Sequence, residues 1–184
     1  NSRWLALAGI TANTPDPDGG TIDRDQHGEP TGVLRETAFE QARAIMGEPS
    51  VSQIEEALKL GGDAFLRSGV TSTVEAGNRR PEELRAYQRL RRAGELPVRT
   101  YLMMMIDEML EAMIEVGLQT GMGDEWLRMG PAKLFSDGSI GGRTARLRAP
   151  FEDQAENVGL WMLPPAELKH KVLRAHSAGF QVGI

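Results

Sequence analysis

The 184-residue sequence contains no cysteine, which excludes disulfide bonds, thiolate metal ligands and a cysteine nucleophile. Disulfides form in oxidising compartments, so their absence favours a cytoplasmic location. The sequence also lacks an apolar run of the roughly 20 residues that cross a bilayer, and its N-terminus shows no basic segment followed by a hydrophobic one. We therefore expect a cytoplasmic protein without a membrane partner.

A strongly basic surface is missing as well. The sequence has 21 Lys and Arg against 26 Asp and Glu, a net charge of −5, and the two signs are interspersed. We predict no nucleic acid partner, because no extended basic surface is available to hold phosphates. The nucleotide-binding spacings G-x-x-x-x-G-K and G-x-G-x-x-G do not occur either. Hydrophobic residues make up 40% of the chain, as in average folded domains, so a packed core is expected.

What the sequence does contain is a repeated strand and helix pattern from residue 50 onward. The predicted strands are residues 69–75, 98–106, 131–136 and 180–184, and the predicted helices are 50–68, 81–93, 107–120 and 164–178. Strands joined by single helices lie parallel and in sequence order. A closed (β/α)₈ barrel needs eight strands and about 250 residues, whereas an open doubly wound sheet can be completed with fewer. We predict an α/β fold whose parallel βα repeats form part of a (β/α)₈ TIM barrel.

The first 49 residues follow a different pattern. Residues 2–8 have helical apolar spacing, and the turn-rich residues 14–35 predict a surface hairpin. The expected domains are therefore an N-terminal helix with a small hairpin insertion over 1–49, and a partial barrel over 50–184. The chain starts at Asn1 rather than Met, and its last predicted strand has no following helix to cover it. We expect an interior piece of a longer protein.

Charged residues occur where the predicted strands end, which is where parallel α/β folds gather their reactive groups. Glu75 closes the first strand, Asp107 follows the second, and Asp137 follows the third. Lys133 lies inside the apolar third strand, where an unpaired ammonium is costly and a reactive neutral amine is favoured. A frayed strand edge or a buried salt bridge would explain Lys133 equally well.

The loop after this strand combines three glycines, a serine hydroxyl and an arginine over residues 137–144. One interpretation is a backbone cradle for an anion, which would make the protein a non-catalytic α/β anion-binding module. The guanidinium of Arg143 could orient a substrate carboxylate or carbonyl, or it could tie down the loop through backbone carbonyls. The residues alone do not decide between these roles.

Residues 133–145 read Lys-Leu-Phe-Ser-Asp-Gly-Ser-Ile-Gly-Gly-Arg-Thr-Ala. This segment resembles the K-x-F-x-D-G-S-x-G-x-R-T-A signature of the amidohydrolase superfamily, in the amidohydrolase-3 group that includes the N-substituted formamide deformylases. Residues 1–3, 7–10, 31–36 and 69–72 resemble the same group in the same order. The resemblance extends from Asn1 to Gln181.

The resemblance implies a distorted (β/α)₈ barrel with one or two divalent metal ions, usually zinc, that activate water to hydrolyse a C–N bond other than a peptide bond. It marks Lys133 as a metal ligand after carboxylation by CO₂, a reaction that needs the neutral amine. Asp137 and Arg143 are the expected substrate-binding residues, and the substrate is expected to be a small amide-type molecule. No residue of the chain is assigned a catalytic role.

The histidine ligands that the resemblance implies are missing from the predicted strand ends. His27 lies in the predicted hairpin turn, and His170 and His176 lie on different faces of the last predicted helix. The fourth predicted strand ends where the group places a histidine on barrel strand five, so the chain is expected to hold barrel strands two to five. We predict that the isolated chain is inactive and that its exposed barrel edges allow self-association.

Overall fold

The chain forms two compact units in a computed structural model that describes residues 2–184, apart from the side chains of Gln41 and Met46. Asn1, where the family resemblance begins, lies outside the described residues. Unit 1 contains the residues up to Glu48 together with Ser136–Pro164, and unit 2 contains Pro49–Phe135 and Pro165–Ile184. Residues 136–164, which the sequence-based division assigned to the barrel segment, therefore group with the N-terminal residues.

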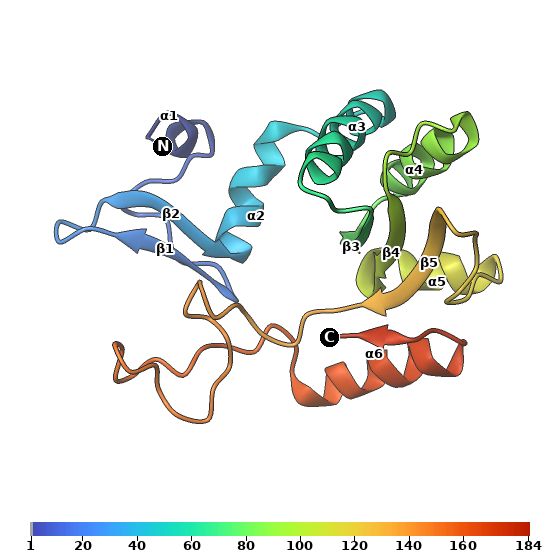
Figure 1. The fold of residues 1–184 in the computed structure, drawn as a ribbon. Helices are drawn as coiled ribbons and strands as arrows, with labels where there is room; N and C mark the ends of the chain where they lie inside the picture. Colours follow the sequence, from blue (N-terminus) through green and yellow to red (C-terminus); the bar gives the residue numbers. More distant parts are fainter. Residues whose placement is uncertain (1) are drawn as a thin grey trace. The chain divides into compact units, whose positions relative to one another are not determined.

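Unit 2 is built on a parallel sheet with the strand order β3-β4-β5-β6 (Figure 1). These strands are β3 (Ser72–Asn78), β4 (Arg99–Met105), β5 (Leu127–Lys133) and β6 (Val182–Gly183). The helices of the unit are α3 (Val51–Arg67), α4 (Pro81–Ala93), α5 (Ile106–Glu115) and α6 (Pro165–Ser177). The predicted α/β class and the parallel, sequential strand order are confirmed, and the arrangement is compatible with part of a TIM barrel.

Local sequence signals explain where the helices of unit 2 begin and end. Ser50 caps α3 in a reciprocal capping box, in which its hydroxyl accepts from the Gln53 N–H and its own N–H donates to Gln53 Oε1. Pro81 occupies the first turn of α4, and the left-handed Gly94 ends it. No helix described between residues 2 and 184 combines the length and apolar character needed to cross a membrane.

The core of unit 2 lies between one face of the sheet and the helices. Side chains alternate along β4, so that Thr100, Leu102 and Met104 are buried. Further core residues, each at most 2% exposed, come from β5, α6 and the segments that follow them: Ala132, Leu134, Ala175 and Phe180. The helix-covered face is thus apolar.

The third predicted strand was placed too late in the chain. Residues 131–136 were expected, but β5 spans Leu127–Lys133, and its pairing with β4 shifts register between Leu102 and Met104. Pro131, which was interpreted as the start of a strand, lies in this irregular stretch, where a missing N–H is tolerated. Gly130 beside it has no room for a side chain, since a Cβ would lie 2.7 Å from the Leu102 carbonyl oxygen.

Unit 1 contains the helix α1 (Ser2–Leu7), the strands β1 (Gly20–Arg24) and β2 (Pro30–Glu36), the helix α2 (Thr37–Arg43) and the 3₁₀ turn η1 (Ala44–Met46). The two strands pair antiparallel. A small core of Ile10, Ile22, Ala38 and Ala42 holds the unit together, with Trp4, Leu5, Ala8 and Leu34 packed around it. The helix α2 was not predicted, because only two small residues, Ala38 and Ala42, mark its buried face.

Candidate metal- and substrate-binding site

Lys133 is the last residue of β5 and lies inside the sheet. It pairs with Met105 of β4 on one side and with Gly183 of β6 on the other, so it does not lie at a frayed edge. Its neighbours Ala132 and Leu134 are each 1% exposed and pack into the core, whereas the Lys133 side chain is only half-buried. By strand parity, Lys133 therefore projects from the face that the helices leave uncovered.

The surroundings of Lys133 are mainly apolar. Its Nζ lies 4.7 Å from the ring centroid of Phe135, which is 41% exposed on the same strand parity. A Cβ on Gly183 would lie 3.9 Å from Lys133 Cδ and 3.7 Å from Met103 Cε, so the glycine keeps space open beside the lysine stem. Among the described residues, Lys133 makes no ion pair, and the buried salt bridge that its sequence context allowed is not seen.

The two acidic residues expected at the ends of the first two strands have partners in the structure, although Glu75 lies inside β3 and only Asp107 follows its strand, β4. Glu75 accepts a hydrogen bond from the Tyr87 hydroxyl at 3.4 Å on the face that α3 and α4 cover. Burial raises the pKa of the Tyr87 phenol, and the Glu75 carboxylate raises that pKa further. Asp107 pairs with Lys171 of α6, which also contacts Glu167 at 3.0 Å. Each of these two carboxylates thus has a partner within its own unit.

Residues 2–184 contain no group of three His, Asp or Glu side chains that could hold a metal ion. His27 lies in the turn between β1 and β2, 3.1 Å from the Gln26 side chain, and His170 and His176 lie on α6. Lys133, the expected ligand, is therefore not accompanied by such a group among the described residues. An amine alone is a poor divalent-metal site, but its carbamate would supply the hard oxygen ligands that such ions accept.

The loop over residues 137–144 is closed by hydrogen bonds among its own groups. The Ser139 N–H donates to Thr144 Oγ1 at 3.0 Å, and the Gly142 N–H donates to Ser139 Oγ at 3.0 Å. The N–H groups of Arg143, Thr144 and Ala145 donate to carbonyl oxygens of Ile140 and Ser139. Two glycines make this closure possible, since a Cβ on Gly138 would lie 2.1 Å from Thr144 Oγ1 and one on Gly142 would lie 2.8 Å from Ser139 Oγ.

The two predicted substrate-binding residues belong to unit 1, whereas Lys133 belongs to unit 2. Asp137 accepts from the Ser136 hydroxyl at 2.5 Å and from the Arg146 N–H at 2.7 Å. Arg143 has a left-handed backbone with φ 59°, and its guanidinium contacts Asp153 at 2.7 Å and the Phe151 ring at 5.3 Å. Both guanidinium contacts are with side chains of unit 1, and no guanidinium contact with a backbone carbonyl is seen among the described residues.

Sequence reasoning did not single out two residues that hold this loop. Arg35 Nη1 donates to the Gly142 carbonyl oxygen at 2.7 Å, and Thr144 Oγ1 donates to Glu36 Oε1 at 2.5 Å. Arg35 and Glu36 end β2 and lie more than 100 positions before the loop residues that they contact. Local spacing could not have revealed these contacts, and the only available signal was that residues 31–36 took part in the family resemblance.

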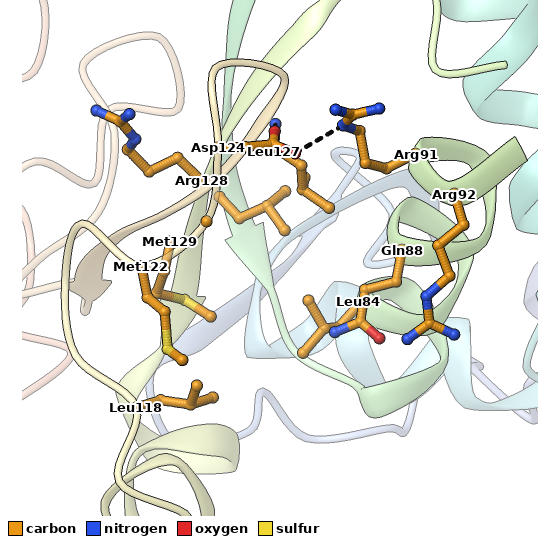
Figure 2. Close-up of a pocket in the computed structure, with 12 residues that line it drawn as sticks. Leu84, Gln88, Arg91, Arg92, Leu118, Met122, Asp124, Leu127, Arg128 and Met129 are labelled. Atoms are coloured by element: carbon orange, nitrogen blue, oxygen red, sulfur yellow. Dashed lines mark hydrogen bonds and ion pairs between the residues drawn. The ribbon is translucent and has the colours of Figure 1, made fainter. Parts of the chain in front are cut away.

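A cavity of about 450 Å³ lies at the other end of β5, where Leu127 begins the strand (Figure 2). Half of its lining residues are leucine or methionine, and Arg91 of α4 donates to Asp124 at 2.9 Å beside them, as the dashed line in Figure 2 marks. Because Lys133 ends the same strand, this cavity lies apart from the candidate ligand. It has no evident part in the site.

The family model of the amidohydrolases matches the whole chain, residues 1–184. This chain belongs to the amidohydrolase family. It is 34% identical to LONG AFTER FAR-RED 3 of Arabidopsis thaliana over 194 residues, and 32% identical to YtcJ of Bacillus subtilis strain 168, whose name assigns it to the amidohydrolases, over 196 residues. Both matches cover 100% of the chain but only 33% and 35% of the relatives, so the chain spans about a third of their length.

Two further comparisons bear on the chemistry. The N-substituted formamide deformylase of Arthrobacter pascens is 35% identical over 102 residues, which cover 53% of the chain and 18% of the relative. The crystal structure of an uncharacterized metal-dependent hydrolase from Pyrococcus horikoshii OT3 superimposes with a TM-score of 0.70 at 28% identity. That match covers 99% of the chain and 35% of the solved structure.

Proposed function

We propose that the complete protein is a metal-dependent amidohydrolase that uses metal-activated water to hydrolyse a C–N bond other than a peptide bond in a small amide- or formamide-type molecule. Family membership and the similarity to a formamide deformylase and to a metal-dependent hydrolase support this proposal. The observation that carries it is the placement of Lys133, an unpaired lysine at the carboxyl end of an interior parallel strand, where α/β barrels gather their reactive groups.

In this proposal Lys133 holds a metal ion as a carbamate. The neutral Nζ attacks the carbon of CO₂, an N–C bond forms, and a proton is released, which leaves two carboxylate-type oxygens. The Lys133 side chain is half-buried and makes no ion pair among the described residues, so no carboxylate occupies its amine. We expect one or two bound zinc ions, which would supply the positive charge that makes water nucleophilic near neutral pH. The remaining ligands would come from parts of the protein outside these 184 residues.

Asp137 and Arg143 are proposed to bind the substrate. Arg143 Nη2 is committed to Asp153, but a guanidinium has five N–H donors, so others remain to orient a substrate carbonyl or carboxylate. The Asp137 carboxylate already accepts two hydrogen bonds, yet its oxygens have further acceptor capacity. Both side chains can therefore bind substrate without breaking the contacts that hold the loop.

The alternative of a non-catalytic anion-binding module fits the loop geometry less well. Such a module needs several backbone N–H groups directed at the ligand. In residues 137–144 and the adjacent Ala145, five N–H groups are already satisfied within the loop, those of Ser139, Gly142, Arg143, Thr144 and Ala145. The loop is therefore better suited to holding side chains in place than to cradling an anion.

The proposed domain organisation rests on the strand and helix pattern and on the family resemblance. Residues 1–49 would form an N-terminal helix and hairpin insertion, and residues 50–184 would provide barrel strands two to five. In the sheet of unit 2, β3 and β6 each pair on one side with a described strand, so each presents an edge. Edges of this kind would pair with neighbouring barrel strands in the complete protein, or with a second copy of the chain in their absence.

The full-length protein tests the proposed function. Zinc content and hydrolysis of N-substituted formamides should both be measurable, and Lys133→Ala should lower both by at least about 100-fold, because even supporting residues of metal sites contribute 10- to 100-fold. Lys133→Arg keeps the positive charge but cannot form the carbamate, so it should fail in the same way. Lys169→Ala, a change on the exposed face of α6, is the matched control. Full metal content and turnover in Lys133→Ala would reject Lys133 as a ligand.

A further inference from the structure

Glu36, the last residue of β2, has a backbone conformation that is unusual for a residue with a side chain. Its φ is 50° and its ψ is −124°, in a region occupied almost only by glycine. Such a conformation persists only where surrounding contacts determine it, and a glycine here would avoid the cost. A glutamate at this position therefore indicates that its side chain makes a contact of value.

That contact is with Thr144 in the loop after β5. The Glu36 carboxylate accepts the Thr144 hydroxyl hydrogen at an O···O distance of 2.5 Å, and Thr144 is 6% exposed. A hydroxyl has one hydrogen, so donation to Glu36 turns its lone pairs toward the Ser139 N–H, which donates to it at 3.0 Å. The carboxylate thereby sets the orientation of the group that closes the loop.

The residue before Glu36 holds the same loop at a second point. Arg35 Nη1 donates to the Gly142 carbonyl oxygen at 2.7 Å. Its Nε and Nη2 donate to the two Asp23 oxygens at 2.7 Å and 2.6 Å, a bidentate pairing that fixes the plane of the guanidinium. Arg35 and Glu36 thus form hydrogen bonds with residues 142 and 144, on both sides of Arg143.

We infer that Glu36 is a positioning residue for substrate binding: through Thr144 it fixes the loop over residues 137–144 and so the directions of Asp137 and Arg143. This inference rests on the proposed function, in which these two side chains bind the substrate. Arg143 itself has φ 59°, so its backbone also depends on contacts with its surroundings. Without the Glu36 contact, the loop would sample other conformations and present the two side chains less often in the binding arrangement.

Hydrogen exchange in the full-length protein tests the loop contact. Glu36→Ala should speed exchange of the Ser139 and Thr144 amides by about tenfold or more, because a hydrogen bond to a charged group is lost. Thr144→Val should have the same effect, and Thr144→Ser, which keeps the hydroxyl, should restore slow exchange. Glu29→Ala is the matched control. Glu29 directly precedes β2, and its side chain makes no hydrogen bond or ion pair among the described residues.

Steady-state kinetics of the same variants separate positioning from a structural role. Glu36→Ala and Thr144→Val should raise KM for an N-substituted formamide about tenfold, leave kcat within about threefold, and leave the zinc content unchanged; Thr144→Ser should recover KM. Unchanged amide exchange in both loss variants would overturn the contact, and faster exchange with an unchanged KM would show a structural role alone. If the wild-type protein hydrolyses no amide, the proposed function fails, while the exchange result still decides whether Glu36 fixes the loop.

Discussion

Individual side chains in this chain show how few contacts keep an irregular segment in one conformation. Thr144 takes part in two hydrogen bonds through one hydroxyl, and Gly138 must be a glycine because a Cβ would meet that hydroxyl at 2.1 Å. Some positions of the signature that residues 133–145 resemble, such as 138 and 144, are thus explained by steric fit or by hydrogen bonds within the loop. Lys133, Asp137 and Arg143 are the members that we propose to bind a metal ion or the substrate.

Asp124 gives a prediction at this scale. Its carboxylate accepts from the N–H groups of Leu127 and Trp126, and Arg91 donates to it; the hydrogen bond from Leu127 is the largest cause of a pKa below the 3.8 usual for aspartate. A lowered folded-state pKa means that the contribution to stability is present above pH 3.8 and is lost as pH falls through the folded-state pKa. Asp124→Asn should therefore be less stable than wild type at pH 7, and the difference should shrink as the pH falls below 3.8.

Urea unfolding followed by circular dichroism at several pH values measures this difference. Glu125→Gln is the control, because the neighbouring carboxylate makes no hydrogen bond or ion pair within the described residues, so the same charge change there should not reproduce the loss of stability at pH 7. A constant stability difference between Asp124→Asn and wild type from pH 7 to pH 2 would contradict the assignment.

At the scale of elements, the sequence predicted the helices and strands of unit 2 well where apolar periodicity agrees with the residues that start or end an element. Helix 81–93 was predicted with the bounds that α4 has, because Pro81 opens it and Gly94 follows it. The strand β5 was misplaced because its Gly130 and Pro131 look like a strand boundary, whereas the sheet accommodates them in an irregular pairing. Tertiary pairing overrode a local signal there, and no local pattern could have shown it.

Packing of α3 leads to a prediction at this scale. Gly61 and Gly62 are adjacent in the helix, but a Cβ on Gly62 would lie 2.6 Å from two carbons of Pro97, while one on Gly61 would meet nothing within 4 Å. Gly62→Ala should therefore destabilise the protein by about 1–3 kcal/mol through overpacking. Gly61→Ala should stabilise it by up to about 1 kcal/mol, because alanine is the better helix former. Thermal unfolding of the two variants measures the contrast, and equal effects of the same sign would show that α3 does not pack on Pro97.

Across the whole molecule, sequence distance and spatial distance diverge most in unit 1. Residues 136–164 join a unit whose other residues end at Glu48, and Thr144 meets Glu36 across 108 positions. Composition and periodicity describe neighbours along the chain, so they could predict the βα repeats but not this assembly. The ligand set of the proposed site is also dispersed. The family resemblance, rather than the strand context alone, marked Lys133 as a ligand, and no group of three His, Asp or Glu side chains that could hold a metal ion occurs among residues 2–184.

This dispersal leads to the last prediction, which concerns the 184-residue chain produced without the rest of the protein. A divalent ion is held by several ligands, and Lys133 is the single candidate among the described residues, so the isolated chain should neither bind zinc tightly nor hydrolyse an amide. Without a cation to neutralise the carbamate, Lys133 should also stay an amine, because metal binding and deprotonated ligands are coupled. Elemental analysis, an assay with N-substituted formamides and a ¹³C spectrum in labelled bicarbonate measure the three expectations. Stoichiometric zinc together with turnover that Lys133→Ala abolishes would show that these residues hold a complete site of their own.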